Sequence, residues 1–157
     1  METIKNDYDG IKLLFQQICE VLGKNVDLNK IQIINRGRPH ETERLPENSM
    51  GIYMFKYNDK YLKIGKANSK SNARFTSQHY NSGSARSNLA KSLLEDVEFC
   101  KKQSLNKDNI KEWMKQNLER IDIILDGELN VFTLNLLEAC LHYKYNPKYE
   151  GYKIQER

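Results

Sequence analysis

The chain has 157 residues and a formal net charge of +4, with 39% hydrophobic and 29% charged residues, eight glycines and three prolines. This composition excludes collagen-like, low-complexity and largely disordered chains, and the length suits one domain with at most a short appendage. No apolar run approaches the roughly 20 residues of a membrane span and the N-terminus is polar, so we expect a cytoplasmic protein without membrane contact. The three cysteines are widely spaced, so we expect them to be reduced thiols.

The first third of the chain predicts a helix followed by a polar loop. Apolar residues at helical spacing indicate a helix over 8–22, which Gly23 ends. The short apolar run Ile31–Ile34 is typical of an edge strand, and residues 35–49 are polar and loop-like. We therefore divide the chain into an N-terminal helical appendage with its polar loop, residues 1–48, and a main domain, residues 49–157.

The main domain begins with a predicted β-hairpin. Its strands cover Met50–Tyr57 and Lys60–Lys66, and the intervening Asn58-Asp59 is a turn signal. A two-residue turn would mix apolar with polar side chains on each face of the hairpin. We therefore favour a loop of three or five residues, in which Tyr53 pairs directly with Lys63.

Helices and one further strand follow the hairpin. Helical spacing is found over 70–80, 87–102, 108–117 and 131–145, and an apolar run over 120–125 indicates a strand. The predicted fold is α/β of the α+β type. It has a small, mainly antiparallel, three-stranded sheet flanked by helices.

The positive charge is concentrated in one stretch. Residues 56–91 carry eight Lys and Arg against one Asp, whereas both flanking segments are slightly acidic. Tyrosines lie among these cations, and such interleaving suits a phosphate backbone and unstacked bases. The stretch predicts a nucleic-acid-binding surface, with a solvated basic face as the alternative. The residues selected for binding are Lys56, Lys66, Lys70, Arg86 and Lys91.

A polar stripe crosses the otherwise apolar last helix at Asn135, Glu138 and His142. A carboxylate in such a helix needs a partner, and either a metal or a cationic side chain would serve. The alternative is an exposed face with a helical Glu–His pair. Sequence motifs for phosphate-binding loops, zinc proteases and serine hydrolases do not occur in the chain.

The ordered set Gly51-Ile52-Tyr53, Lys63-Ile64-Gly65, Arg74, Glu138 and Asn146 resembles the GIY-YIG nuclease domain over residues 50–147. Lys63 stands where the family usually has its second tyrosine, and restriction-type branches are similar to this chain in carrying lysine there. The resemblance implies a GIY-YIG-like fold and a metal-dependent endonuclease that hydrolyses DNA phosphodiester bonds, of restriction or defence type. The alternatives are a catalytically inactive nucleic-acid-binding module of the same fold, and an interaction subunit with an acidic partner.

The resemblance also implies roles for individual residues. Glu138 would hold one Mg²⁺ or Mn²⁺ per active site, and Arg74 would neutralise charge on the five-coordinate phosphorus. Tyr53 would orient or deprotonate the attacking water, with Lys63 as the neighbouring cation that lowers its pKa. The set of expected catalytic residues is completed by His79, as a phosphate contact or proton-transfer group, and Asn146, as a support. Double-stranded DNA is the expected partner, and a cutter of palindromic sites is expected to form a homodimer.

Overall fold

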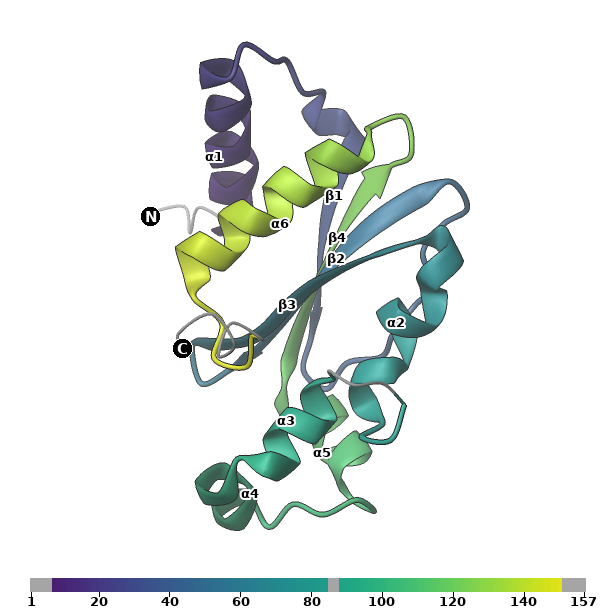
Figure 1. Cartoon of the computed structure of the whole chain (residues 1–157), viewed down its shortest axis with the longest axis vertical. Helices are drawn as coiled ribbons and strands as arrows, with labels where there is room; N and C mark the ends of the chain where they lie inside the picture. The colour runs from purple at the N-terminus through teal and green to yellow at the C-terminus, as the bar shows by residue number, and fades with distance from the viewer. Residues whose placement is uncertain (1–6, 85–87, 151–157) are drawn as a thin grey trace, which may run out of the picture.

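The computed structural model describes residues 7–84 and 88–150, which form one four-stranded antiparallel sheet and six α-helices (Figure 1). The strands follow the spatial order β1-β4-β2-β3 and are β1 (Ile31–Gly37), β2 (Ser49–Tyr57), β3 (Lys60–Asn68) and β4 (Glu119–Asp126). The helices are α1 (Asp7–Val21), α2 (Asn72–Thr76), α3 (Leu89–Glu95), α4 (Val97–Gln103), α5 (Ile110–Asn117) and α6 (Val131–Tyr145). Short 3₁₀ turns connect some of them: η1 (Leu28–Lys30), η2 (Ser69–Ser71) and η3 (Gln78–Tyr80).

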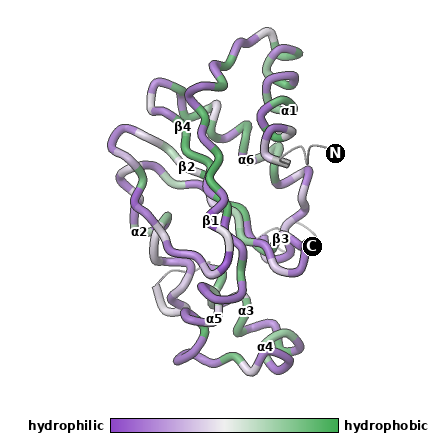
Figure 2. Tube along the Cα trace, turned by 180° about the vertical axis from the view of Figure 1, so that it is seen from behind, coloured by the Kyte–Doolittle hydropathy of each residue, from purple (hydrophilic) through white to green (hydrophobic). Residues whose placement is uncertain are grey.

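Helices cover both faces of the sheet (Figure 1). α1 and α6 pack on the face that carries Ile52, Met54 and Ile64, and together they enclose an aliphatic core. α2, α3 and α5 pack on the opposite face, where Tyr53 and Phe55 lie in a second core rich in aromatic rings. Figure 2 shows hydrophobic residues along the central strands and hydrophilic loops around them. Tyr53 therefore lies between the sheet and the α2–α3 layer.

Most predicted elements agree with the structure to within a few residues. The helix predicted over 87–102 is two helices, because Asp96 has extended backbone and caps α4 by accepting the N–H of Phe99 at 3.1 Å. The helix predicted over 70–80 is reduced to the five residues of α2 between the turns η2 and η3. Among the described residues, no helix combines the length and the apolar character needed to span a membrane.

The sheet has one strand more than the predicted three, because β1 pairs with β4. Ile31 lies opposite Leu125 and Ile33 opposite Ile123 in antiparallel register. β1 thus covers an edge of β4 that would otherwise present unpaired backbone groups. α1 adds Phe15, which is only 1% exposed, to the same aliphatic core. Residues before 49 therefore build the sheet and a core together with the later part of the chain.

The hairpin turn has two residues, not the three or five that we expected. Asn58 and Asp59 both have positive φ, 47° and 63°, as a type I′ turn requires. Tyr57 accordingly pairs with Lys60 across the turn. Asn and Asp tolerate this left-handed conformation better than most residues, so local turn chemistry determines the loop length.

A bulge in β3 has the effect on the two faces of the hairpin that we expected from a loop of three or five residues. Leu62 is an extra residue of β3, beyond which Phe55 lies opposite Lys63 and Tyr53 opposite Gly65. The predicted direct pairing of Tyr53 with Lys63 is therefore wrong. Because side chains alternate along a strand, the two residues still share one face. Leu62 itself packs in the aromatic core.

Candidate active site

Tyr53 lies in the middle of β2 with its ring directly over Gly65 of β3. A Cβ atom on Gly65 would overlap the ring and hydroxyl of Tyr53. Gly51, which shares this face, leaves room for α2, since a Cβ there would lie 2.7 Å from Cε2 of Phe75. Both glycines of the hairpin are thus needed for close packing, and Gly65 leaves the space that the Tyr53 ring and hydroxyl occupy.

Two N–H groups converge on that hydroxyl. Arg74 of α2 donates from Nε at 3.3 Å, and His79 of η3 donates from Nε2 at 2.6 Å. The His79 tautomer follows from its other nitrogen, because Nδ1 accepts the backbone N–H of Leu89 at 3.3 Å. The proton of the neutral ring must then lie on Nε2. Two donors on one phenol oxygen favour negative charge on that oxygen.

Burial opposes this effect. Tyr53 is fully buried, which raises its pKa, while the charge and hydrogen bond of Arg74 act to lower it. Burial lowers the pKa of His79 to about 3, and the positive charges of Lys63 and Arg74 act in the same direction. At neutral pH the contact therefore joins a neutral phenol to a neutral imidazole.

Arg74, rather than Lys63, is the cation that contacts the Tyr53 hydroxyl. Lys63 is 5% exposed, and its Nζ donates to the carbonyl of Tyr149 at 3.3 Å. Burial lowers the pKa of Lys63, and the negative charge of Glu150 partly opposes this. We expected the positive charge beside the Tyr53 hydroxyl to come from Lys63. In this structure it comes from Arg74.

The polar stripe of α6 faces the edge strand β3. Lys66 donates to Oδ1 of Asn135 at 2.7 Å and pairs with Oε2 of Glu138 at 2.8 Å. His142 donates from Nε2 to the carbonyl of Ile64 at 2.8 Å. The side chains of Glu138 and His142 are 16% and 14% exposed, so the stripe is not an exposed Glu–His face. The partner that the Glu138 carboxylate requires is Lys66.

Glu138 is also the residue to which the resemblance to GIY-YIG nucleases assigns a divalent cation. Within the described ranges, no three His, Cys, Asp or Glu side chains form a cluster suited to a metal. Mg²⁺ does not need such a cluster, because it keeps several waters and binds one or two carboxylates together with phosphate oxygens. The ammonium of Lys66 already lies against Glu138. A metal ion at this carboxylate would have to replace the Lys66 ammonium group.

The remaining predicted residues have varied surroundings. Asn146 ends α6 in the left-handed conformation, with φ 44°, and its backbone N–H donates to the carbonyl of His142 at 2.9 Å. Lys56 and Lys91 pair with nearby carboxylates at 3.7 and 3.9 Å, and Lys70 is exposed in η2. Arg86 lies outside the described residues.

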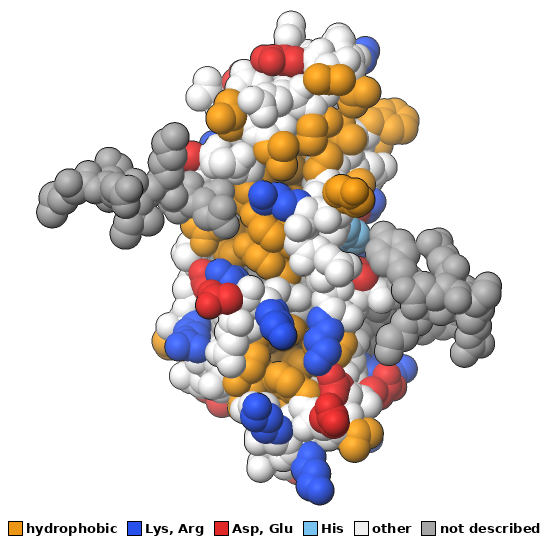
Figure 3. Space-filling model, turned by 90° about the vertical axis from the view of Figure 1, so that its left-hand side faces the viewer, with side chains coloured by type: hydrophobic (Ala, Val, Ile, Leu, Met, Phe, Trp, Pro, Cys, Tyr) orange, Lys and Arg blue, Asp and Glu red, His pale blue; other side chains and the backbone are white. Residues whose placement is uncertain are grey.

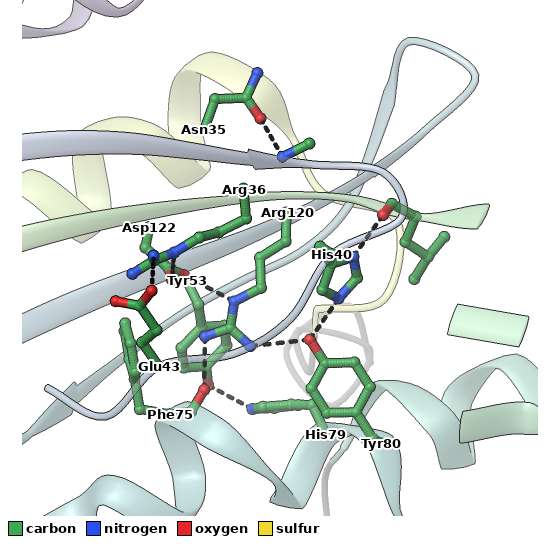
Figure 4. A network of polar contacts seen from close by, with 12 residues as sticks. Asn35, Arg36, His40, Glu43, Tyr53, Phe75, His79, Tyr80, Arg120 and Asp122 are labelled. Carbon is green, nitrogen blue, oxygen red and sulfur yellow. Dashed lines mark hydrogen bonds and ion pairs between the residues drawn. The ribbon is translucent and has the colours of Figure 1, made fainter. Parts of the chain in front are cut away.

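Sequence analysis did not identify a buried ionic network beside Tyr53 (Figure 4). Arg120 and Asp122 of β4 are both fully buried and are joined by a 2.8 Å contact from Nε to Oδ1. Asp122 also accepts the Nε–H of Arg36 at 3.0 Å, and Arg120 donates from Nη1 to the hydroxyl of Tyr80 at 3.0 Å. A signal was present, because two charged residues two positions apart in an apolar strand must share one face.

The chain matches no protein-family model, no curated protein and no solved structure. A phenol oxygen held by two N–H donors, with the guanidinium of Arg74 beside it and the buried Lys63 on the same face, can orient a nucleophile. The pair of Glu138 and Lys66 lies on the other face, where α6 packs. Of these groups, the exposed guanidinium of Arg74 can stabilise negative charge on a bound phosphate.

Proposed function

We propose that this chain is a metal-dependent endonuclease that hydrolyses phosphodiester bonds of double-stranded DNA. The observation that carries the proposal is the convergence of Arg74 and His79 on the hydroxyl of Tyr53. All three residues are among the catalytic residues that the resemblance to GIY-YIG nucleases implies. The reaction class, and a role in restriction or defence, come from the resemblance to GIY-YIG nucleases.

Arg74 is the group of this set that can meet a phosphate most directly. Its side chain is exposed although Nε is directed at Tyr53, and a guanidinium carries further N–H donors. These donors suit the oxygens of a phosphate and the charge that develops at phosphorus. Tyr53 would orient the attacking water through its hydroxyl, and His79 would hold that hydroxyl in place.

Glu138 would hold the Mg²⁺ or Mn²⁺ ion. When bound, such an ion polarises the scissile phosphate and stabilises the departing oxygen. Because Glu138 pairs with Lys66 at 2.8 Å, we expect a metal at this carboxylate to displace the ammonium group. Lys66 would then be released toward the nucleic acid.

The alternative function is a nucleic-acid-binding module without cleavage. The burial of Tyr53, His79 and Lys63, at 0%, 2% and 5% exposure, favours this alternative. None of these groups can touch a phosphate without a local rearrangement of the chain around them. A module that only binds would need exposed cations such as Lys70 but would have no use for Glu138.

Incubation of the protein with supercoiled plasmid separates the two functions. Nicking or linearisation with Mg²⁺, and its loss with a chelator, is expected of the nuclease. Retardation of the plasmid in a gel without any cut, at all metal concentrations, would show the binding module instead.

Glu138→Gln tests the metal site within the same assay. We expect the variant to lose cleavage by about 10²-fold or more, since the ligand charge is gone, while plasmid binding in chelator stays close to that of the wild type. Glu41→Gln is a matched control, because Glu41 also pairs with a lysine, Lys115, at 2.8 Å but is 82% exposed. Undiminished cleavage by Glu138→Gln would remove Glu138 from the site.

A further inference from the structure

The segment that carries Arg74 and His79 is not stabilised by its own secondary structure. α2 has five residues and η3 has three, and the residues that precede them, Ser71 and Ser77, make no capping side-chain hydrogen bond. Helices this short are unstable in isolation. The positions of both N–H donors therefore depend on contacts that tie the segment to the sheet.

Arg120 of β4 ties the segment at two points (Figure 4). Its Nη2 donates to the backbone carbonyl of Phe75 at 2.6 Å, and its Nη1 donates to the hydroxyl of Tyr80 at 3.0 Å. Phe75 directly follows Arg74 in the chain, and Tyr80 directly follows His79. One guanidinium thus holds the residue next to each of the two groups that contact Tyr53.

The orientation of Arg120 is in turn determined by buried partners. Asp122 accepts its Nε–H at 2.8 Å and is itself held by Arg36 at 3.0 Å. The Tyr80 hydroxyl donates to Nε2 of His40 at 2.7 Å, because the other His40 nitrogen donates to a backbone carbonyl. These partners therefore hold Nη1 and Nη2 of Arg120 in one orientation toward the segment.

A gain in stability does not account for such a network. Burying an ion pair removes both charges from water, and replacing such a pair by apolar side chains of similar volume is often neutral or stabilising. A guanidinium differs from an apolar side chain in directing several N–H donors in a rigid plane. The planar fork of Arg120 fits two acceptors that lie five residues apart in the chain.

We propose that Arg120 is a positioning residue of the active site. Through the Phe75 carbonyl and the Tyr80 hydroxyl it holds Arg74 and His79 against Tyr53. This inference rests on the proposed function, because it concerns the residues to which that function assigns the chemistry. It adds a part for Arg120 that neither the sequence pattern nor the resemblance assigned.

Tyr80→Phe is the sharpest test, since it removes one hydroxyl and keeps the buried ring. We expect the Nε2–H signal of His79 in proton–nitrogen NMR to shift or to broaden through exchange with water. We expect kcat for plasmid nicking to fall about 10- to 100-fold with little change in KM, as for a misplaced catalytic group. Arg120→Lys, which keeps the charge and loses the fork, should behave in the same way and replaces Tyr80→Phe if that variant does not fold.

Leu125→Ala is the control for a loss of stability alone. Leu125 is fully buried in the aliphatic core on the other face of the sheet, so its truncation lowers the melting temperature without touching the network. An unchanged His79 signal, and a loss of kcat no larger than in Leu125→Ala, would overturn the proposal. The NMR measurement needs no cleavage, so a wild-type protein that cuts no plasmid would overturn the proposed function separately.

Discussion

The hydroxyl of Tyr53 is subject to opposing influences. Arg74 and His79 both donate to it, which favours the phenolate, whereas burial and the negative charges of Glu150 and Glu138 raise its pKa. The net effect is a raised pKa, so Tyr53 is a neutral phenol at neutral pH. In this form, the part that the proposed function gives to Tyr53 is to orient the attacking water through a hydrogen bond. Removal of the water's proton would require a change in the surrounding charges.

His79 predicts a pH dependence of stability. Its pKa is lowered from 6.5 to about 3 in the folded state, chiefly by burial. The unfolded chain therefore binds one more proton between these values, and stability is fully present above pH 6.5 and falls as the pH drops toward 3. His79→Gln keeps an N–H donor for Tyr53 and should reduce this slope by about 1.4 kcal/mol per pH unit.

Urea unfolding at pH 7, 6, 5 and 4 measures the slope. His40 is a second buried imidazole with a lowered pKa, so the variant should keep part of the wild-type dependence. Tyr143→Phe, at a side chain that is 94% exposed, serves as a control and should leave the dependence intact. A slope in His79→Gln equal to that of the wild type would mean that His79 is not held neutral by the fold.

The hairpin shows how one element satisfies two conflicting local demands. Asn58 and Asp59 form a two-residue turn, which by itself would bring unlike side chains onto each face. The extra residue Leu62 shifts the register by one, so that Tyr53 and Lys63 lie on the same face. The bulge also leaves Gly65 opposite Tyr53, where the tyrosine ring needs a residue without a side chain.

Gly65→Ala tests this arrangement. The new methyl group would overlap the Tyr53 ring and displace its hydroxyl from Arg74 and His79. We expect a loss of about 1–3 kcal/mol in unfolding free energy through overpacking, together with a marked loss of plasmid cleavage. Gly10→Ala in α1, where a Cβ meets open space, should instead stabilise the protein by about 0.5–1 kcal/mol. Full activity in Gly65→Ala would show that the Tyr53 position is not critical.

At the scale of the whole molecule, the basic stretch divides into two groups of residues. Lys63 is buried, and Lys66 is paired with Glu138 of α6. Lys60, Lys70 and Arg74 are exposed. Figure 3 shows further Lys and Arg side chains, with Asp and Glu among them, over the lower half of the face away from α2. The exposed cations are those that can contact backbone phosphates.

The salt dependence of DNA binding tests whether the exposed cations of the basic stretch contact phosphates. Lys70→Ala should flatten the slope of log K against log salt concentration by about 0.9, the value for one lost phosphate contact. Lys115→Ala is the matched control, because this lysine lies on α5, outside the basic stretch, and is paired with Glu41. Fluorescence anisotropy of a labelled duplex in chelator, at several salt concentrations, gives both slopes. Equal slopes for Lys70→Ala and the wild type would place the DNA surface elsewhere.

Sequence alone determined the elements and the face on which the site lies. Periodicity located the helices and strands, and the alternation of apolar and polar residues correctly put Tyr53 and Lys63 on one face, although the turn that we inferred from it was wrong. These features are local, so a short stretch of sequence contains all the interactions that decide them.

The tertiary structure decided which side chains contact one another. Arg74 contacts Tyr53 in place of Lys63, Lys66 is the partner of Glu138, and Arg120 connects β4 to the segment after the hairpin. These contacts join residues 21 to 72 positions apart. They depend on strand order and register, which arise only when both cores pack. The pairing of β1 with β4 also depends on the packing of distant parts of the chain.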